Sequence, residues 1–315
     1  MPSFSCTVEQ DIDPGLRLDR YAAENLKILS RSQIKARGLE ARLNGKAVKI
    51  SRVLKGGDYL ELSWTEAESP FLIPQNIPLD LVYEDSRVIV INKAQGMVVH
   101  PGAGNRQGTL ANALLYRMLE KNPLPEKGGG PQSFDKAGLR PGIVHRLDKD
   151  TSGIIIAAWD DEALAFLSDQ FKARRVRKSY AAIVQGCPKD RQGRIEKRIV
   201  RSRRDRKTFT VSDTEGRACL TCYKLIRSYG NYSLLLLRPK TGRTHQIRVH
   251  LKYLGNPILG DPIYGRQDPR FPKASLMLHA KSLSLILPEH LTSQTFTTPL
   301  PKRFREIVWG VGNRE

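Results

Sequence analysis

The sequence has few acidic residues relative to its basic ones, and it lacks any long apolar run. Its 52 Lys and Arg stand against 32 Asp and Glu, which leaves a formal net charge of +20. An excess of this size is typical of proteins that bind a polyanion, either nucleic acid or a membrane surface. No apolar run approaches the roughly 20 residues needed to span a bilayer, and the first residues lack a signal-peptide pattern. We therefore expect a cytoplasmic protein that binds nucleic acid and no membrane.

Cysteine is also scarce, with four residues at Cys6, Cys187, Cys219 and Cys222. Cys219 and Cys222 have the spacing of a zinc knuckle, but no second pair and no nearby histidine accompanies them. They lie in a predicted strand, where positions three apart point to opposite faces. Because structural zinc needs four converging ligands, this pattern favours buried reduced thiols and predicts no metal site.

Composition and periodicity divide the chain into three parts. Residues 1–66 contain a short helical pattern, a second helix that begins with the capping-box pair Ser30 and Gln33, and a hairpin turn at Asn44-Gly45. Residues 67–79 are rich in proline and have little periodicity, which indicates a linker. Residues 80–315 contain many short apolar strands and few helices, and they are numerous enough for one large domain.

One charged loop in the large domain has the composition of a reactive site. Three basic or potentially basic side chains, His145, Arg146 and Lys149, surround the carboxylate of Asp148 in the sequence. A predicted turn, T-S-G, follows and leads directly into an unbroken apolar run that indicates a buried strand. Loops held by rigid strands often carry catalytic groups, although a solvated turn before a strand would have the same appearance.

Two long motifs add a resemblance to a known family. H-R-L-D-K-D-T-S-G at residues 145–153 and T-G-R-T-H-Q-I-R at residues 241–248 resemble signatures of the RluA-type pseudouridine synthases. Shorter matches are G-M-V-V-H-P-G at residues 96–102, K-x-Y-x-A at residues 178–182 and G-N-P-I-L-G-D-P-I-Y-G at residues 255–265. The resemblance implies isomerisation of uridine in RNA to pseudouridine, without a cofactor or a metal. It also implies an α+β catalytic domain with a curved, mainly antiparallel mixed β-sheet flanked by helices.

The resemblance further implies roles for individual residues. Asp148 matches the catalytic aspartate, Arg243 the basic residue that forms an ion pair with it, and Tyr180 the tyrosine that lies against the target base. Arg243 and Arg146 would keep Asp148 ionised, which suits a nucleophile better than a general acid. Tyr180 is a candidate base for the carbon-5 proton, and Arg146 is expected to help displace the flipped base. The other substrate-contacting residues that we predict are His145, Lys178, Ile247 and Leu278.

The N-terminal residues resemble a second family. L-S-R-S-Q-I at residues 29–34 and L-N-G-K-A-V at residues 43–48 are similar to the S-four-type RNA-binding module, named after a small-subunit ribosomal protein. The RNA contacts predicted in this module are Arg31, Lys35, Arg37 and Lys46. A module of this kind ahead of the catalytic domain favours large-subunit ribosomal RNA as the substrate, either free or in an assembling particle. We expect the enzyme to be a monomer. Transfer RNA is the alternative. Residues 194–207, eight of them basic, are expected to form either a phosphate-binding hairpin or a solvated basic face.

Two other classes of function compete with this interpretation. An RNA-binding assembly protein without catalytic activity would need only the basic surface, so the presence of Asp148, Tyr180 and Arg243 argues against it. A hydrolase using His145 and Asp148 would need a placed nucleophile such as Ser152. A serine in a T-S-G turn is more simply explained as structural.

Overall fold

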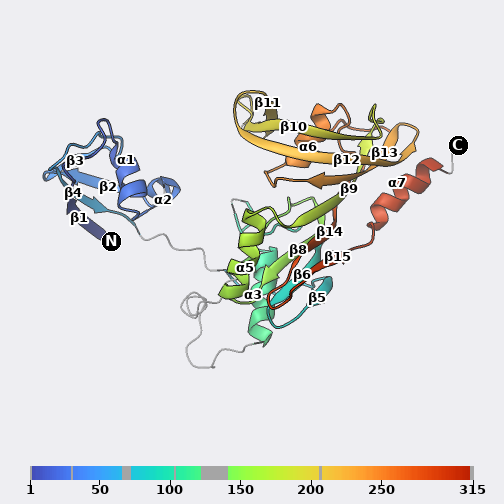
Figure 1. Cartoon of the computed structure of the whole chain (residues 1–315), viewed down its shortest axis with the longest axis horizontal. Helices are drawn as coiled ribbons and strands as arrows, with labels where there is room; N and C mark the ends of the chain where they lie inside the picture. Colours follow the sequence, from blue (N-terminus) through green and yellow to red (C-terminus); the bar gives the residue numbers. More distant parts are fainter. Residues whose placement is uncertain are drawn as a thin grey trace. The chain divides into compact units, whose positions relative to one another are not determined.

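The computed structural model describes residues 2–29, 31–65, 72–102, 104–121, 141–205 and 208–312 (Figure 1). Two compact units meet in the sequence between Phe71 and Leu72. Residues 72–79, which we predicted to be part of a linker, belong to the second unit. The side-chain amide of Asn112 donates to the carbonyl oxygen of Ile73 at 2.7 Å, and the Gln75 N–H donates to the Asn112 carbonyl oxygen at 3.1 Å. This proline-rich segment is therefore held by hydrogen bonds to the large unit.

The first unit contains a four-stranded antiparallel sheet in the order β1-β4-β2-β3. Its predicted hairpin turn is confirmed, because Asn44 and Gly45 both have positive φ angles, 51° and 78°. Ser30 lies outside the described residues, so the predicted capping box stays a prediction. Strand β1 was not predicted, although Phe4 and Cys6 alternate with polar residues, because the pattern is only five residues long and most of its side chains are exposed. The elements are β1 (Ser3–Thr7), α1 (Leu18–Arg20), the π-helix η1 (Tyr21–Asn25), α2 (Arg31–Ala36), β2 (Glu40–Leu43), β3 (Lys46–Val48) and β4 (Tyr59–Ser63).

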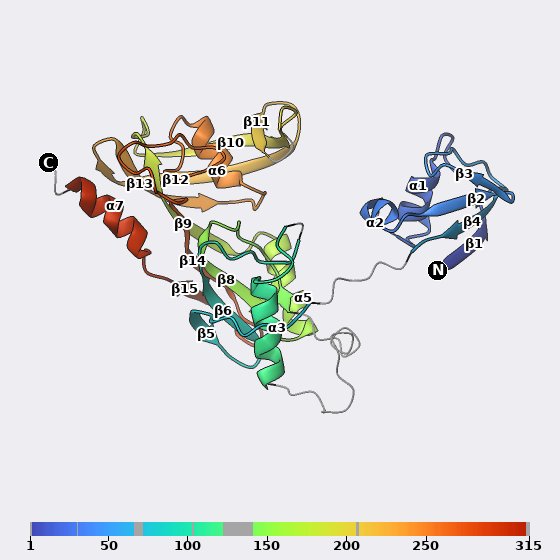
Figure 2. The same ribbon diagram turned by 180° about the vertical axis from the view of Figure 1, so that it is seen from behind.

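The second unit is organised around an eleven-stranded sheet in the described part of the chain (Figure 2). The main order is β11-β10-β12-β13-β9-β14-β8-β6-β5, with β15 on β14 and β7 on β8. All its strand pairs are antiparallel except β14 with β8, which confirms the predicted mixed, mainly antiparallel sheet. The strands are β5 (Leu81–Glu84), β6 (Val88–Lys93), β7 (Gly142–Ile143), β8 (Ser152–Ala158), β9 (Arg177–Gln185), β10 (Gln192–Arg201), β11 (Phe209–Ser212), β12 (Arg217–Tyr229), β13 (Tyr232–Pro239), β14 (Leu278–Ile286) and β15 (Ser293–Thr297).

Helices cover both faces of this sheet, and they are α3 (Leu110–Lys121), α5 (Asp161–Lys172), α6 (Gln246–Tyr253) and α7 (Lys302–Gly312). Leu114 of α3 packs against Ile89 and Ile155, whereas Leu167 of α5 packs against Val88 and Ile156. Successive strand residues point to opposite faces, so α3 and α5 enclose β6 and β8 between them. Helix α6 packs on the β10 to β13 half. No helix among the described residues is both long and apolar enough to cross a membrane.

Strand β8 holds the charged loop, and all seven of its residues are buried. This confirms the predicted buried strand, but the predicted T-S-G turn is wrong. Ser152 and Gly153 already belong to β8 and pair in parallel with His279 and Ala280 of β14. Gly153 has a φ of +113°, and a Cβ atom there would lie 2.2 Å from the Ala280 carbonyl oxygen. The glycine is required because the two central strands approach each other too closely for a side chain.

Candidate active site

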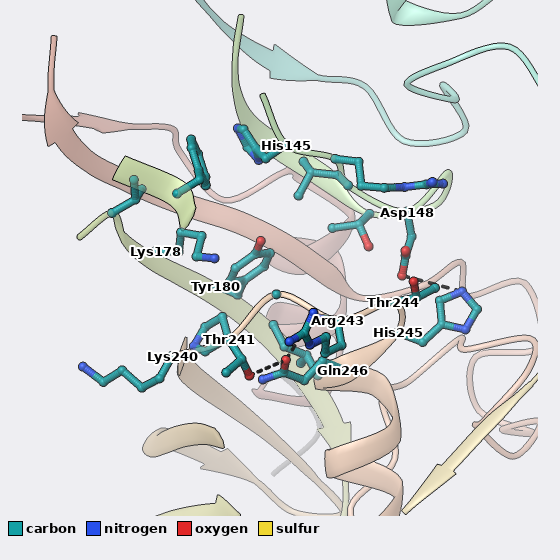
Figure 3. Close-up of a pocket in the computed structure, with 18 of the residues that line it drawn as sticks. His145, Asp148, Lys178, Tyr180, Lys240, Thr241, Arg243, Thr244, His245 and Gln246 are labelled. Carbon is teal, nitrogen blue, oxygen red and sulfur yellow. Dashed lines mark hydrogen bonds and ion pairs between the residues drawn. The ribbon is translucent and has the colours of Figure 1, made fainter. Parts of the chain in front are cut away.

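A cavity of about 600 Å³ opens where the charged loop faces the segment that joins β13 to α6 (Figure 3). The loop contributes residues 144–148, and the joining segment contributes residues 239–248. Strand β9 supplies Lys178 and Tyr180, and β14 supplies Leu278. The end of α5 and the residues after it, between 168 and 176, also line the cavity, so the wall is built from five parts of the chain. All eight substrate-contacting or catalytic residues predicted in the large domain line this cavity, and they are His145, Arg146, Asp148, Lys178, Tyr180, Arg243, Ile247 and Leu278.

Asp148 is the carboxylate that lines the cavity, and its side chain is 21% exposed. Its Oδ2 lies 3.5 Å from Nη1 of Arg248 and 3.9 Å from Nε2 of His245. The Arg248 guanidinium is only 3% exposed. A partly exposed carboxylate with a buried cation behind it is accessible to a substrate while its charge is balanced from within the protein.

The predicted ion pair between Arg243 and Asp148 is wrong in this structure. Among the described residues, the arginine paired with Asp148 is Arg248, five positions later in the same motif. Helix α6 begins at Gln246, so Arg248 lies in its first turn and is directed inward, whereas Arg243 lies in the preceding turn. The motif contains both arginines, and only the start of the helix decides which one reaches the carboxylate. The Arg243 side chain lines the cavity, and its buried Nε has no hydrogen-bond partner among the residues that the structure describes.

Arg248 is held in place by a second carboxylate, Asp261, which sequence reasoning missed. Its Nε and Nη2 donate to the two oxygens of Asp261 at 2.8 and 2.7 Å. Burial by itself raises the pKa of Asp261, but hydrogen bonds and charge from Arg248 outweigh it and hold that pKa below its ordinary value. Asp261 lies in G-D-P-I-Y-G, so the signal was an acid inside a motif already matched to the family. This two-point contact fixes the guanidinium plane and leaves Nη1 directed toward Asp148.

The turn before α6 is fixed by Gln246. Its Oε1 accepts hydrogen bonds from the Thr241 hydroxyl at 2.7 Å and from the Arg243 N–H at 3.1 Å (Figure 3). Its side-chain amide donates to the Leu220 carbonyl oxygen at 3.1 Å and to Thr221 at 3.0 Å. These four bonds tie the joining segment to β12, so the residues of the second motif enter the cavity from a rigid support.

His145 lines the cavity as a neutral structural histidine. Burial, and to a smaller extent the charge of Lys178, lowers its pKa to about 3. The Ile156 N–H donates to its Nε2 at 3.1 Å, and its ring stacks on Phe171 with a centroid distance of 4.6 Å. Because Nε2 is already an acceptor in β8, His145 is poorly suited to be the base of a hydrolase.

Ser152 is equally unsuited to be a nucleophile. Its side chain is buried, its Oγ lies 2.9 Å from Nδ1 of His279, and it accepts a hydrogen bond from Arg303 at 2.6 Å. Burial is the main cause that lowers the pKa of His279 to about 4. Both residues are buried within the paired strands β8 and β14 and neither lines the cavity, so the geometry argues against the hydrolase alternative.

Tyr180 and Lys178 form the opposite wall of the cavity on β9. Burial, and then the charge of Asp148, raises the pKa of Tyr180 above its ordinary value of 10. Burial lowers the pKa of Lys178, whose Nζ lies 5.9 Å from the centre of the Phe171 ring. A tyrosine that stays protonated offers a flat ring and a hydroxyl donor. The raised pKa is compatible with stacking on the base, and the role of base that we predicted stays a prediction.

The RNA contacts predicted in the first unit have different surroundings. Arg31 and Lys46 are exposed, and Arg31 lies 4.0 Å from Asp19. Arg37 is half-buried, and its carbonyl oxygen accepts a hydrogen bond from the Thr65 hydroxyl. The side chain of Lys35 lies outside the described residues. Their role in RNA binding stays a prediction.

Comparison with known proteins gives a consistent result. Residues 87–253 match the family described as RNA pseudouridylate synthase. The chain is 44% identical over 296 residues to ribosomal large subunit pseudouridine synthase D of Borreliella burgdorferi, covering 92% of this chain and 88% of that protein. It is 38% identical to the protein of the same name from Zymomonas mobilis, covering 96% and 95%. Human RNA pseudouridylate synthase domain containing 1 has a similar structure, with a TM-score of 0.55 and 28% identity over 75% of this chain and 86% of that one.

Proposed function

The chain belongs to the RNA pseudouridylate synthase family and isomerises uridine to pseudouridine, and from this premise we propose that it acts on large-subunit ribosomal RNA with Asp148 as the catalytic residue. The observation that supports the assignment of Asp148 is its position. It is the partly exposed carboxylate of the cavity, and it is backed by the buried guanidinium of Arg248.

The chemistry requires one bond from the uracil to be broken and another to be made. The bond from the sugar to nitrogen-1 breaks, the uracil turns, and carbon-5 joins the sugar. A carboxylate can form a covalent intermediate or stabilise positive charge on the sugar while the first bond is broken. Asp148 is accessible for either role. Tyr180, with its ring in the cavity wall opposite, can hold the uracil by stacking while the bond is exchanged.

The target uridine must be presented outside its RNA stack, because the residues assigned to the reaction line a cavity in the protein. Extruding a base costs a few kcal/mol, which contacts elsewhere on the RNA must offset. Arg146 is exposed at the rim of the cavity, where it can take the place of the flipped base. Strand β10 adds exposed arginines, among them Arg194, Arg198 and Arg201, for contacts with phosphates.

The choice of ribosomal RNA rests on the names of the relatives and on the resemblance of the N-terminal residues to an S-four-type module. Arg31, Lys35, Arg37 and Lys46 are the residues of that unit that we assign to RNA phosphates, as in an S-four-type module. The same proposal makes the protein a cytoplasmic monomer that acts on free ribosomal RNA or on an assembling particle. Transfer RNA is the second candidate substrate.

Tritium release from RNA labelled at carbon-5 of uridine tests the proposal directly. Asp148→Asn should abolish release while RNA binding, measured by filter retention, persists. Asp150→Asn is the matched control, because this carboxylate is two residues away and does not line the cavity. Ribosomal and transfer RNA transcripts run in parallel identify the substrate class. Release by Asp148→Asn at the wild-type rate would overturn the catalytic assignment, and release from transfer RNA alone would overturn the substrate.

A further inference from the structure

His245 combines an unusual backbone conformation with a position beside the catalytic carboxylate. It is the N-cap of α6, and its φ and ψ angles are 55° and 14°, in the left-handed region. A non-glycine residue in this region is uncommon, and such conformations cluster at functional sites where the surrounding structure enforces them. The conformation directs the imidazole into the cavity, where its side chain is 16% exposed (Figure 3).

The surrounding hydrogen bonds select one tautomer of this imidazole. Tyr264 Oη lies 2.8 Å from His245 Nδ1 and accepts a hydrogen bond from the Phe209 N–H at 2.9 Å. Within the described residues, Nδ1 is the acceptor in reach of the Tyr264 hydroxyl hydrogen. With Tyr264 donating to Nδ1, the ring proton of a neutral His245 is on Nε2. That nitrogen is the one that faces Oδ2 of Asp148, at 3.9 Å.

The environment also favours the neutral ring. Burial is the main cause that lowers the pKa of His245 below its ordinary value. The carboxylates of Asp148 and Asp261 act in the opposite direction, while the guanidinium groups of Arg248 and Arg146 lower the pKa further. A neutral ring with hydrogen on Nε2 can donate to the carboxylate without carrying a charge that would compete with Arg248.

We propose that His245 is a positioning residue for Asp148, and that Tyr264 sets the tautomer that turns its Nε2–H toward the carboxylate. The distance of 3.9 Å closes to a hydrogen bond when the substrate fills the cavity, as catalytic hydrogen bonds commonly tighten in the substrate complex. Asp148 is then held from two sides, by Arg248 and by His245. The proposal rests on the assignment of Asp148 as the catalytic residue.

The contacts that orient His245 extend to the hairpin formed by β10 and β11. Phe209 of β11 also presents its ring edge-on to His245, with a centroid distance of 5.7 Å, and Arg201 of β10 lies 5.6 Å from the centre of the Phe209 ring. The orientation of His245 thus depends on the hairpin that we assign to RNA phosphates.

The left-handed conformation provides a matched pair of variants. His245→Gly removes the side chain and suits the backbone, and His245→Asn tolerates the same backbone while supplying an amide N–H. We expect kcat to fall about tenfold or more in His245→Gly with KM changed less than twofold, and partial recovery in His245→Asn. Wild-type kcat in His245→Gly would overturn the inference. If Asp148→Asn were active as well, the proposed function itself would fail, so the two failures are distinguishable.

Imidazole ¹⁵N spectra test the arrangement without any turnover, with the His245 signal identified by its loss in His245→Asn. The neutral ring should carry its proton on Nε2 in the wild type and should become a mixture of tautomers in Tyr264→Phe. In Asp148→Asn the titration of His245 should move to lower pH, since a carboxylate that raises its pKa has been removed. A proton on Nδ1 in the wild type, or an unchanged titration in Asp148→Asn, would contradict the proposal.

Discussion

Arg248 joins the carboxylates of Asp148 and Asp261, two residues more than a hundred positions apart in the chain. Its Nη1 lies 3.5 Å from Asp148, and its other two nitrogens hold Asp261 at 2.8 and 2.7 Å. The side chain of Asp261 is fully buried, so the stability of the domain and the charge balance of the cavity depend on the same guanidinium.

Arg248→Lys should therefore impair catalysis far more than Arg243→Lys. A lysine cannot make the two-point contact with Asp261 while also facing Asp148, because its charge is a single point on a flexible stem. We expect kcat to fall about 100-fold in Arg248→Lys, and less than about fivefold in Arg243→Lys, in the tritium-release assay. The reverse ranking would restore Arg243 as the functional partner of Asp148.

Arg248→Ala should also destabilise the protein, because it leaves Asp261 buried without its cation. Breaking one side of a buried ion pair costs about 3–5 kcal/mol. Urea denaturation would measure the loss, and Asp261→Asn combined with Arg248→Met should recover part of it. No recovery in the double variant would mean that packing, and not the uncompensated charge, causes the loss.

Lys93 should make the free energy of unfolding depend on pH in the alkaline range. It is buried, and its Nζ donates to the carbonyl oxygens of Ala94, Met97 and Lys149. Burial lowers its pKa from 10.5 to about 8. Between these values the unfolded chain binds a proton that the native state has lost, so raising the pH stabilises the native state. We expect the free energy of unfolding to gain about 2–3 kcal/mol from pH 7 to pH 10 relative to Lys93→Met. Parallel pH profiles for the two proteins would contradict this assignment.

Gly153→Ala should disrupt the centre of the sheet. The added Cβ would meet the backbone of Ala280, and the φ of +113° is unfavourable for alanine in any case. We expect a loss of about 3–5 kcal/mol in urea denaturation. Gly102→Ala is the matched control, because no atom of the described residues lies within 4 Å of its added Cβ. If both substitutions had an equal, small effect, β8 and β14 could move apart without a loss of stability.

Tyr180→Phe should retain more activity than Tyr180→Leu. Burial and Asp148 raise the pKa of Tyr180, so its ring and not a phenolate is available at neutral pH. Stacking of an aromatic ring on a base contributes about 1–3 kcal/mol, which corresponds to a fall of roughly 5- to 150-fold in kcat/KM for Tyr180→Leu. Equal, near-complete losses in both variants would instead support Tyr180 as a base.

The residues of the cavity could be found from sequence because they lie in continuous motifs. H-R-L-D-K-D-T-S-G placed His145, Arg146 and Asp148, and K-x-Y-x-A placed Lys178 and Tyr180. Their partners could not be found in the same way. The choice between Arg243 and Arg248 depends on where α6 begins, and the role of His145 depends on a backbone N–H of β8.

Local patterns were enough to establish the charge, the buried strand β8, the turn at Asn44-Gly45 and the family. Each of these depends on residues close together in the chain, because the spacing of apolar side chains and the residue types of a turn are local features. The pairing of β8 with β14, the contact of Arg248 with Asp261 and the tautomer of His245 depend on segments that meet only after the chain has folded. Packing and burial set these contacts and the charge states that follow from them, and no local pattern encodes either.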